Sequence, residues 1–286
     1  MNLSDQCEKE TPYRGRIAPS PTGYLHLGHA RTFYTAYSRA LKHNGWLIYR
    51  DEDLDFQRCK PEFSQAAVED LLWLGIRWKG DVIRQSQRLP LYREAFERLK
   101  KNGFIYPCTC SRKDVAQAAS APHPSPDGEP IYPGTCRERS IRDIPGGTQI
   151  VWRFRVPDGE TIRFHDGHFG EQSFIAGKSE NADFGDFIVW RHDDLPSYQL
   201  AVTVDDAQMG ITEVVRGADL LLSTARQILL YRALGQKSPS FYHCPLVTDE
   251  NGNRLAKRCD SLSLRALRNS GITPQEIISK WSDDDV

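Results

Sequence analysis

The sequence predicts an α/β fold in which a Rossmann-like, doubly wound parallel sheet is interrupted by an insertion. Short apolar segments alternate with helical segments over residues 14–103, and the composition then shifts to Cys, Pro, Gly and Ser over residues 104–145. The alternation returns after residue 186. Alternating strands and helices are typical of a parallel sheet. An insertion of about 80 residues is large enough for one small domain.

The first half of the predicted sheet follows from periodicity and from residues that end helices. A glycine after an amphipathic segment favours the end of a helix, and Gly45 and Gly103 occupy such positions. Buried strands of a parallel sheet are short apolar runs, such as WLIYR at 46–50. We therefore expect strands at 14–18 and 46–50, and helices at 28–44, 62–74 and 90–102.

The second half of the chain repeats this alternation. Residues 150–156 alternate between apolar and polar side chains, as a half-buried strand does. Thr273 and Pro274 suit the N-cap and first position of a short C-terminal helix. Asp205 and Asp206 are expected at the end of a strand, where they would either contact a ligand or cap the next turn. The expected strands are 186–190, 198–206, 211–216 and 241–247, and a long helix is expected at 219–234.

Composition and charge narrow the class of protein. The chain has 286 residues, of which 39% are hydrophobic, and a formal net charge of −1. This charge argues against a strong overall attraction to nucleic acid but permits a local basic face. No apolar run approaches the roughly 20 residues that span a membrane, and the polar N-terminus lacks the apolar core of a signal peptide. The expected protein is cytoplasmic and monomeric, with no membrane partner.

Residues 16–40 contain an unusual concentration of backbone-restricting and backbone-freeing residues. Pro19 and Pro21 follow the first expected strand, and Gly28 opens the next helix, between His26 and His29. The N-terminus of a helix attracts anions, and two histidines three residues apart can donate to one phosphate. The alternative is a proline-rich connector with two surface histidines. Because strand end, prolines, glycines and helix start coincide, we favour a nucleotide site.

Several segments resemble class I aminoacyl-tRNA synthetases. APSPTGYLHLGH at 18–29 is similar to the first signature of that class, usually written HIGH. YRDEDLD, PSYQLAVTVDDAQMGITEVVRGADLLLSTARQILLYRALG and NGNRLAKR resemble the glutamyl branch in the same order. The resemblance runs from Arg14 to Arg258. It implies a class I catalytic domain at 14–103 and 186–258, a zinc-containing, RNA-guiding subdomain at 104–185 and a short helical tail at 259–286, with no anticodon-binding domain.

The resemblance also implies a site for glutamate and ATP. Glutamate carries one ammonium group and two carboxylates, so its site needs an acid and at least one arginine. Glu52 matches the family's ammonium ligand, and Arg16 and Arg216 match its carboxylate ligands, without showing which arginine takes which carboxylate. The remaining matches are Ala18, Ser20 and Tyr198 in the glutamate site, and His26, Gly28, His29 and Lys257 in the ATP site.

The segment RLAKR at 254–258 resembles the second class I signature, KMSKS. Lys257 matches the lysine that holds the phosphates in the transition state. Arg254 and Ala256 depart from the signature, and arginine keeps the charge of lysine but not its geometry. The resemblance implies Mg²⁺ as the companion of ATP, although no motif identifies the Mg²⁺ ligands.

The insertion contains a candidate metal site. Cys108, Cys110 and Cys136 have short spacings that suit one structural Zn²⁺, which prefers four tetrahedral sulfur and nitrogen ligands. Three reduced cysteines without metal are the alternative. Ligand chemistry favours His123 as the fourth ligand, whereas the resemblance points to Tyr132. Candidate phosphate contacts in the same region are Arg137, Arg139, Arg142, Arg153 and Arg155.

The short segment after Arg258 leads to three hypotheses. It resembles a truncated branch of the family that activates L-glutamate with ATP without tRNA and then forms glutamyl-queuosine in the anticodon of tRNA(Asp). A truncated synthetase that charges the acceptor end is the second hypothesis, and the missing anticodon-binding region argues against it. A non-catalytic regulatory paralogue is the third. Intact His26, Gly28, His29 and Lys257 argue against that paralogue.

Overall fold

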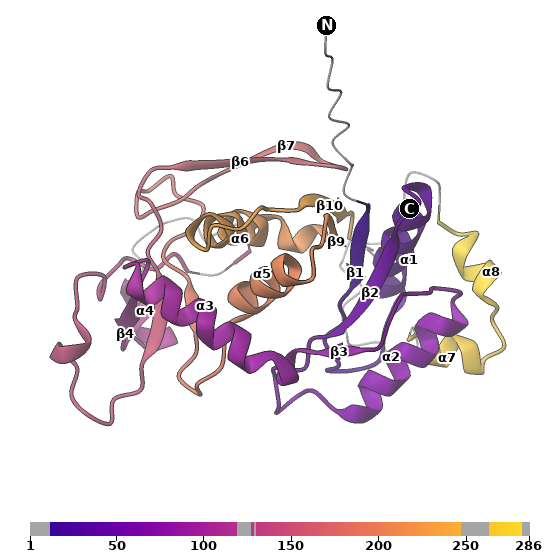
Figure 1. Ribbon diagram of the computed structural model, residues 1–286, viewed down its shortest axis with the longest axis horizontal. Coiled ribbons are helices and arrows are strands. Elements are labelled where there is room, and N and C mark those ends of the chain that lie inside the picture. Colours follow the sequence, from indigo (N-terminus) through magenta and orange to yellow (C-terminus); the bar gives the residue numbers. More distant parts are fainter. Residues whose placement is uncertain (1–11, 119–126, 129, 247–262, 282–286) are drawn as a thin grey trace, which may run out of the picture.

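Two sets of hydrogen-bonded strands from distant parts of the chain lie side by side at the centre of the computed structural model and together form a parallel layer (Figure 1). The structure describes residues 12–118, 127–128, 130–246 and 263–281. The strands of the parallel sheet are β1 (Arg14–Ile17), β2 (Trp46–Asp51), β3 (Ile83–Arg84), β9 (Glu213–Gly217) and β10 (Ser240–Cys244). The two parts adjoin where the Thr212 amide donates to the Arg14 carbonyl at 2.9 Å. The predicted parallel core of the fold is confirmed.

An antiparallel hairpin from the insertion extends this sheet and makes it mixed. The hairpin consists of β6 (Thr161–Asp166) and β7 (Gly170–Ile175). At its end, Asp166 of β6 pairs in parallel with Phe241 of β10. In Figure 1 the hairpin runs as a long ribbon above α6 and ends beside β10. A segment that is remote in sequence therefore reaches the centre of the protein.

The rest of the insertion begins a second, antiparallel sheet. Its strands are β4 (Ile105–Cys108), β5 (Val151–Phe154) and β8 (Ile188–Trp190). Gly103, with φ of 73°, ends the helix before β4, as predicted. Strand β8 lies after residue 185, the predicted end of the insertion, and yet it pairs with β5 of the insertion. The second sheet therefore contains strands from both sides of that predicted boundary. The proposed domain boundaries at 103/104, 185/186 and 258/259 stay predictions.

The helices cover the parallel sheet and continue to the C-terminal region. They are α1 (Leu27–Lys42), α2 (Pro61–Trp73), α3 (Leu89–Lys101), α4 (Arg112–Ala118), α5 (Tyr198–Gln208), α6 (Leu221–Ala233), α7 (Leu264–Asn269) and α8 (Pro274–Ile278). Short 3₁₀ turns occur at Gln85–Arg88, Ile141–Asp143 and Ala218–Leu220. The predicted cap of α8 is confirmed, because Thr273 and Glu276 form a reciprocal capping box. No helix in the described ranges is both long and apolar enough to cross a bilayer.

The strand predicted at 198–206 is wrong, because this segment forms helix α5. The Ser197 hydroxyl caps the helix by accepting from the Leu200 amide. All residues from Leu200 to Asp206 are buried, so the middle of α5 lacks the amphipathic period that distinguishes a helix. Asp205 and Asp206 consequently lie in a buried helix, not at the end of a strand.

The end of α1 shows why Gly45 is required. Asn44, with φ of 51°, is the residue in the left-handed conformation, and the Gly45 amide donates to the Ala40 carbonyl at 2.8 Å. This pattern is a Schellman motif. A Cβ on Gly45 would lie 2.4 Å from the Tyr13 carbonyl oxygen. The predicted helix end is confirmed, but its glycine is needed for close packing against β1.

Two apolar clusters hold the layers together. One packs α1 and α2 against β1 and β2 and also receives Ile277 of α8. The other packs α3, α5 and α6 against β4, β5, β8 and the β6–β7 hairpin. Neighbouring residues of β9 and β10 enter different clusters: Val215 and Tyr242 belong to the first, and Val214 and Phe241 to the second. The clusters therefore cover opposite faces of the parallel strands.

Candidate functional site

A cavity of about 670 Å³ opens at the carboxyl ends of the central strands. Segments that directly follow β1, β2 and β10 line it, together with the start of α1 and the end of β9. Crevices at this end of a parallel sheet are the usual ligand sites of such folds. The predicted site residues that line the cavity are Arg16, Ala18, Ser20, His26, Gly28, His29, Glu52, Tyr198 and Arg216. Lys257, Arg254 and Ala256 lie outside the described residues.

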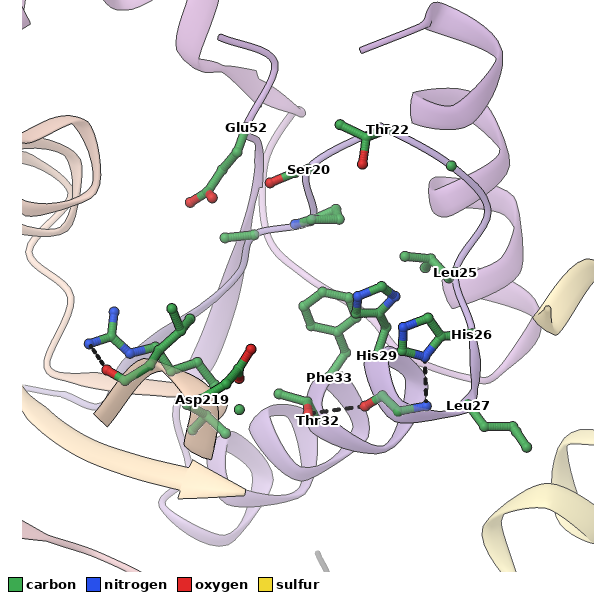
Figure 2. A pocket seen from close by; sticks show the side chains of 18 of the residues that line it. Ser20, Thr22, Leu25, His26, Leu27, His29, Thr32, Phe33, Glu52 and Asp219 are labelled. Carbon is green, nitrogen blue, oxygen red and sulfur yellow. Dashed lines mark hydrogen bonds between the residues drawn. The ribbon is translucent and has the colours of Figure 1, made fainter. Parts of the chain in front are cut away.

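The two histidines stand together at the start of α1 (Figure 2). Their ring centroids are 3.7 Å apart, and Nδ1 of His26 accepts from the Gly28 amide at 3.1 Å. His26 is thus the N-cap of α1, a role that the sequence pattern did not indicate. Because Nδ1 of His26 accepts, a neutral ring carries its proton on Nε2. The site combines imidazole groups with the positive end of a 16-residue helix, which suits an anionic ligand.

Arg216 supplies a positive charge that no carboxylate of the described chain neutralises directly. Its Nε donates to Nε2 of His243 at 3.1 Å, its Nη1 to Gln227 at 2.9 Å and its Nη2 to the Thr224 hydroxyl at 2.7 Å. All three acceptors are uncharged side chains, and Arg216 is itself buried. Four of its five N–H groups are engaged once the longer bond to the Leu220 carbonyl is counted. The remaining N–H on Nη1 suits an incoming anion.

Arg50 has the opposite environment and was missed by the sequence analysis. It is fully buried, donates to Asp206 at 2.6 Å and to Glu52 at 2.9 Å, and lies 3.7 Å from Asp205. Its own charge is therefore compensated within the protein. The charged residue at the end of the otherwise apolar run WLIYR was the available signal. Arg50 holds Glu52 at the cavity instead of binding a ligand.

Asp205 and Asp206 complete this buried network from α5. Asp205 accepts from Arg88, Gln85 and Tyr92, at 2.7, 2.8 and 2.8 Å respectively. Asp206 lies 3.5 Å from Nε of Arg16. Neither aspartate lines the cavity. Their role in the structure is to position arginines, so neither of the two roles predicted for them at a strand end applies.

Glu52 has the features of an ammonium ligand. Burial is the largest influence on the group and raises the pKa of Glu52, whereas the neighbouring Arg50 opposes this shift. A second positive group would relieve the remaining desolvation of the carboxylate. Figure 2 shows Glu52 and Ser20 facing the same space between the two parts of the sheet.

Both flanks of residues 247–262 contact α1 or the segment just before it. Arg31 of α1 donates to the Pro245 carbonyl, and the Leu264 amide donates to the Leu25 carbonyl at 2.7 Å. Pro245, Leu246 and Ser263 also line the cavity. The two ends of the segment that contains Lys257 are therefore held beside His26.

The cysteine cluster lies in the insertion, away from the cavity. The sulfur atoms of Cys108, Cys110 and Cys136 all lie within 4.8 Å of one another. The Tyr132 hydroxyl is 3.3 Å from Sγ of Cys108 and 3.6 Å from Sγ of Cys110. Tetrahedral coordination at a Zn–S distance of about 2.3 Å places sulfurs about 3.8 Å apart. The four groups thus fit one tetrahedral metal ion, whereas His123 lies outside the described residues.

The five arginines suggested as phosphate contacts divide into two groups. Arg137 is buried and pairs with Asp158 at 2.6 Å, and the buried Arg153 donates to Sγ of Cys108 at 3.4 Å. These two stabilise the insertion, so the suggestion is wrong for them. Arg139 and Arg142 are exposed, and Arg155 is partly exposed. The suggestion stays a prediction for these three.

The parallel strands, the histidine pair at the helix start and the cavity between them fit a class I synthetase catalytic fold. Residues 13–281 match the family of class I tRNA synthetases (E and Q), catalytic domain. The chain belongs to this family, which is a family of ATP-dependent ligases. The Glutamyl-Q tRNA(Asp) synthetase of Symbiobacterium thermophilum is 46% identical over 277 residues, which cover 92% of this chain and 84% of that protein.

Glutamate–tRNA ligases are also similar. The enzyme of Hydrogenobaculum sp. is 39% identical, and the match covers 96% of this chain and 59% of that enzyme. The crystal structure of a glutamate tRNA ligase from Elizabethkingia meningosepticum, in complex with its amino acid, superposes with a TM-score of 0.73 at 30% identity. That match covers 87% of this chain and 52% of the ligase, so this chain spans about half the length of that protein.

The Arg50→Met variant should lose about 3–5 kcal/mol of unfolding free energy, because it leaves buried Glu52 and Asp206 without their partner. Orphaned, buried carboxyls have folded-state pKa values above their unfolded values. Their protonation therefore restores stability as the pH falls, so the loss should be smaller at pH 5 than at pH 8.

Urea unfolding of Arg50→Met and Arg58→Met measures both effects. Arg58 pairs with Asp55 in solvent and should matter by less than about 1 kcal/mol. Equal losses in both variants would contradict the role given to Arg50.

Proposed function

We propose that this chain activates L-glutamate with ATP and then transfers the glutamyl group to queuosine in the anticodon of tRNA(Asp). The observation that carries the proposal is one cavity in which the histidine pair at the start of α1 faces an acid and two arginines suited to glutamate. Glutamyl-Q tRNA(Asp) synthetases from several organisms, at 42–46% identity, support the assignment of the acceptor.

Glutamate binding follows from the charges in the cavity. Glu52 receives the ammonium group, and Arg16 and Arg216 receive the two carboxylates. Arg216 is the stronger candidate for a direct charge pair, because all its partners in the described chain are neutral. Arg16 already lies near Asp206. Ala18, Ser20 and Tyr198 shape the remaining walls.

Activation joins a glutamate carboxylate to the α-phosphate of ATP. A carboxylate oxygen attacks the α-phosphorus, the bond to the bridging oxygen breaks, and pyrophosphate leaves. His26, His29 and the amide groups at the start of α1 stabilise the negative charge that develops on the phosphate oxygens. Lys257 is expected to hold the same phosphates. Mg²⁺ accompanies ATP and lowers its charge.

Transfer uses the mixed anhydride formed in the first step. A hydroxyl of the queuosine cyclopentene ring attacks the glutamyl carbonyl carbon, and AMP leaves as its phosphate oxygen takes the electron pair. The ring carries a cis-diol, as a terminal ribose does, so the same chemistry serves either acceptor. Exposed Arg139 and Arg142 of the insertion are the candidates for contacts to the RNA backbone. Splayed loop bases are accessible to a protein pocket.

Charging of the acceptor end of tRNA(Glu) is the second candidate function. The similarity to glutamate–tRNA ligases supports it, since those relatives reach 39% and 40% identity. Both candidates share the activation step and differ only in the nucleophile. The site of attachment on RNA therefore decides between them.

The purified protein should exchange pyrophosphate into ATP when glutamate is present and tRNA is absent. Glutamine should support far less exchange, because its amide offers Arg216 no negative charge. The measurement is incorporation of labelled pyrophosphate into ATP with each amino acid. A strict requirement for tRNA, or a preference for glutamine, would contradict the proposed activation step.

Labelled glutamate should attach to tRNA(Asp) that contains queuosine and not to tRNA(Asp) that lacks it. Each tRNA is tested with and without periodate treatment. Periodate destroys the cis-diol of the terminal ribose, but it also attacks other cis-diols, so the untreated samples are needed as controls. Nuclease mapping then locates the label. Equal incorporation into both tRNAs, or label at the acceptor end of tRNA(Glu), would favour the second candidate.

We also propose that Cys108, Cys110, Tyr132 and Cys136 hold one structural Zn²⁺. The fit of their four donor atoms to a tetrahedron supports this, as does the buried Arg153, whose guanidinium lies 3.8 Å over the Tyr132 ring. A positive group beside anionic ligands offsets their mutual repulsion. The ion would join Cys108 of β4 to Cys136, which lies in the segment before β5. In the described residues, no strand pairing links these two cysteines.

Metal analysis should find one zinc per chain in the wild type. The Cys136→Ser variant should lose it, because a hydroxyl replaces a thiolate. Tyr132→Phe, compared with His123→Ala, assigns the fourth position: loss of zinc affinity is expected in the first variant only. Wild-type protein without zinc would refute the site, and zinc loss in His123→Ala alone would move the fourth position to His123.

A further inference from the structure

Behind the cavity, a chain of buried groups connects Arg216 to the β6–β7 hairpin. Nδ1 of His243 lies 2.6 Å from Oδ2 of Asp166, and Nε2 of His243 lies 3.1 Å from Nε of Arg216. Asp166 and His243 are fully buried and Arg216 nearly so. Neither Asp166 nor His243 lines the cavity or has a role in the reaction described above.

The arginine determines where the proton of His243 lies. An arginine Nε–H can only donate, so Nε2 of His243 must carry a lone pair. A neutral His243 then has its proton on Nδ1, from which it donates to Asp166. A protonated ring would place a second N–H against Nε–H of Arg216, so this geometry requires a neutral ring. Burial lowers the pKa of His243 in the same direction and outweighs the raising effect of the hydrogen bond to Asp166.

Asp166 is held so that it can enforce this arrangement. Its Oδ1 accepts from the amides of Phe169, His168 and His243 at 2.9, 3.0 and 3.3 Å. Hydrogen bonds from His243 and from the Phe169 amide lower the pKa of Asp166, although burial alone would raise it. The carboxylate is therefore ionised, and its Oδ2 faces the imidazole as an acceptor that cannot donate.

We propose that Asp166 and His243 are positioning residues that fix Arg216 for glutamate. Asp166 selects the Nδ1–H tautomer of His243, and Nε2 then anchors the guanidinium without neutralising its charge. A carboxylate placed directly against Arg216 would compete with the substrate, whereas a neutral imidazole orients the arginine and leaves its charge available. The inference rests on the proposed binding of a glutamate carboxylate by Arg216.

The Asp166→Asn variant tests the tautomer. The asparagine carbonyl must face the three amides that now bind Oδ1, so its NH₂ group replaces Oδ2 beside Nδ1 of His243. Two donors cannot face each other, and the His243 proton should move to Nε2, opposite Nε–H of Arg216. Arg216 then loses its anchor. We expect the glutamate KM in pyrophosphate exchange to rise about 10- to 100-fold, with the ATP KM unchanged.

Nitrogen NMR of the histidine rings, in protein without substrates, reports the tautomer independently of activity. Wild type should show His243 protonated on Nδ1, and Asp166→Asn should show it protonated on Nε2. Glu171→Gln is the matched control, because Glu171 pairs with His165 on the same hairpin in solvent, at 2.8 Å. That variant should change neither the His243 signals nor the glutamate KM.

A second pair of variants guards against misfolding of Asp166→Asn. His243→Gln keeps an acceptor near the position of Nε2, whereas His243→Asn keeps a donor near Nδ1 and removes that acceptor. The glutamate KM should rise more in His243→Asn. Three outcomes would overturn the proposal. The first is a wild-type His243 that is protonated on Nε2, and the second is a changed tautomer in Asp166→Asn with an unchanged glutamate KM. The third is an equal glutamate KM in the two His243 variants. Absence of any glutamate-dependent exchange in wild type would instead refute the proposed function, while NMR would still decide the tautomer.

Discussion

The buried guanidinium of Arg50 is the group on which the geometry of the cavity depends. It binds Glu52 at the end of its own strand and Asp206 of α5, across 156 residues of sequence. It thereby joins the end of β2 to helix α5. Because removing one member of a buried ion network leaves the others unpaired in a medium of low polarity, the network behaves as a unit. Glu52 and Arg16 are oriented by this unit and not by local structure.

Arg50 and Arg216 are two arginines of one fold with opposite surroundings. Both are buried, and both sit near strand ends. Arg50 is surrounded by carboxylates and has no charge left for a ligand, whereas the partners of Arg216 are an imidazole, an amide, a hydroxyl and a carbonyl. Residue type alone cannot distinguish them, because the difference lies entirely in what surrounds each side chain. The proposed preference of the cavity for an acidic amino acid depends on this difference.

Local signals predicted much of the fold and failed where tertiary contacts decide. Periodicity located α1, α2 and α3 to within a few residues, since each has a polar face. It could not distinguish α5, in which Leu200–Asp206 are all buried, from a buried strand, whereas the equally buried α6 was located as a long segment. The residues of the candidate site show the same contrast between local signals and tertiary contacts. Motifs identified His26, His29 and Glu52, but His243 depends on partners 27 and 77 residues away, which no local pattern reveals.

The β6–β7 hairpin connects the insertion to Arg216 in the wall of the cavity. One oxygen of Asp166 closes the turn of the hairpin through the amides of His168 and Phe169, and the other holds His243. A shift in that turn would thus be felt at Arg216 through two hydrogen bonds. Interactions of this kind are short, directional and shielded from water, so a displacement of a fraction of an ångström weakens them. In the proposed function, contact of RNA with the insertion and binding of glutamate at Arg216 would therefore be linked through these shared atoms.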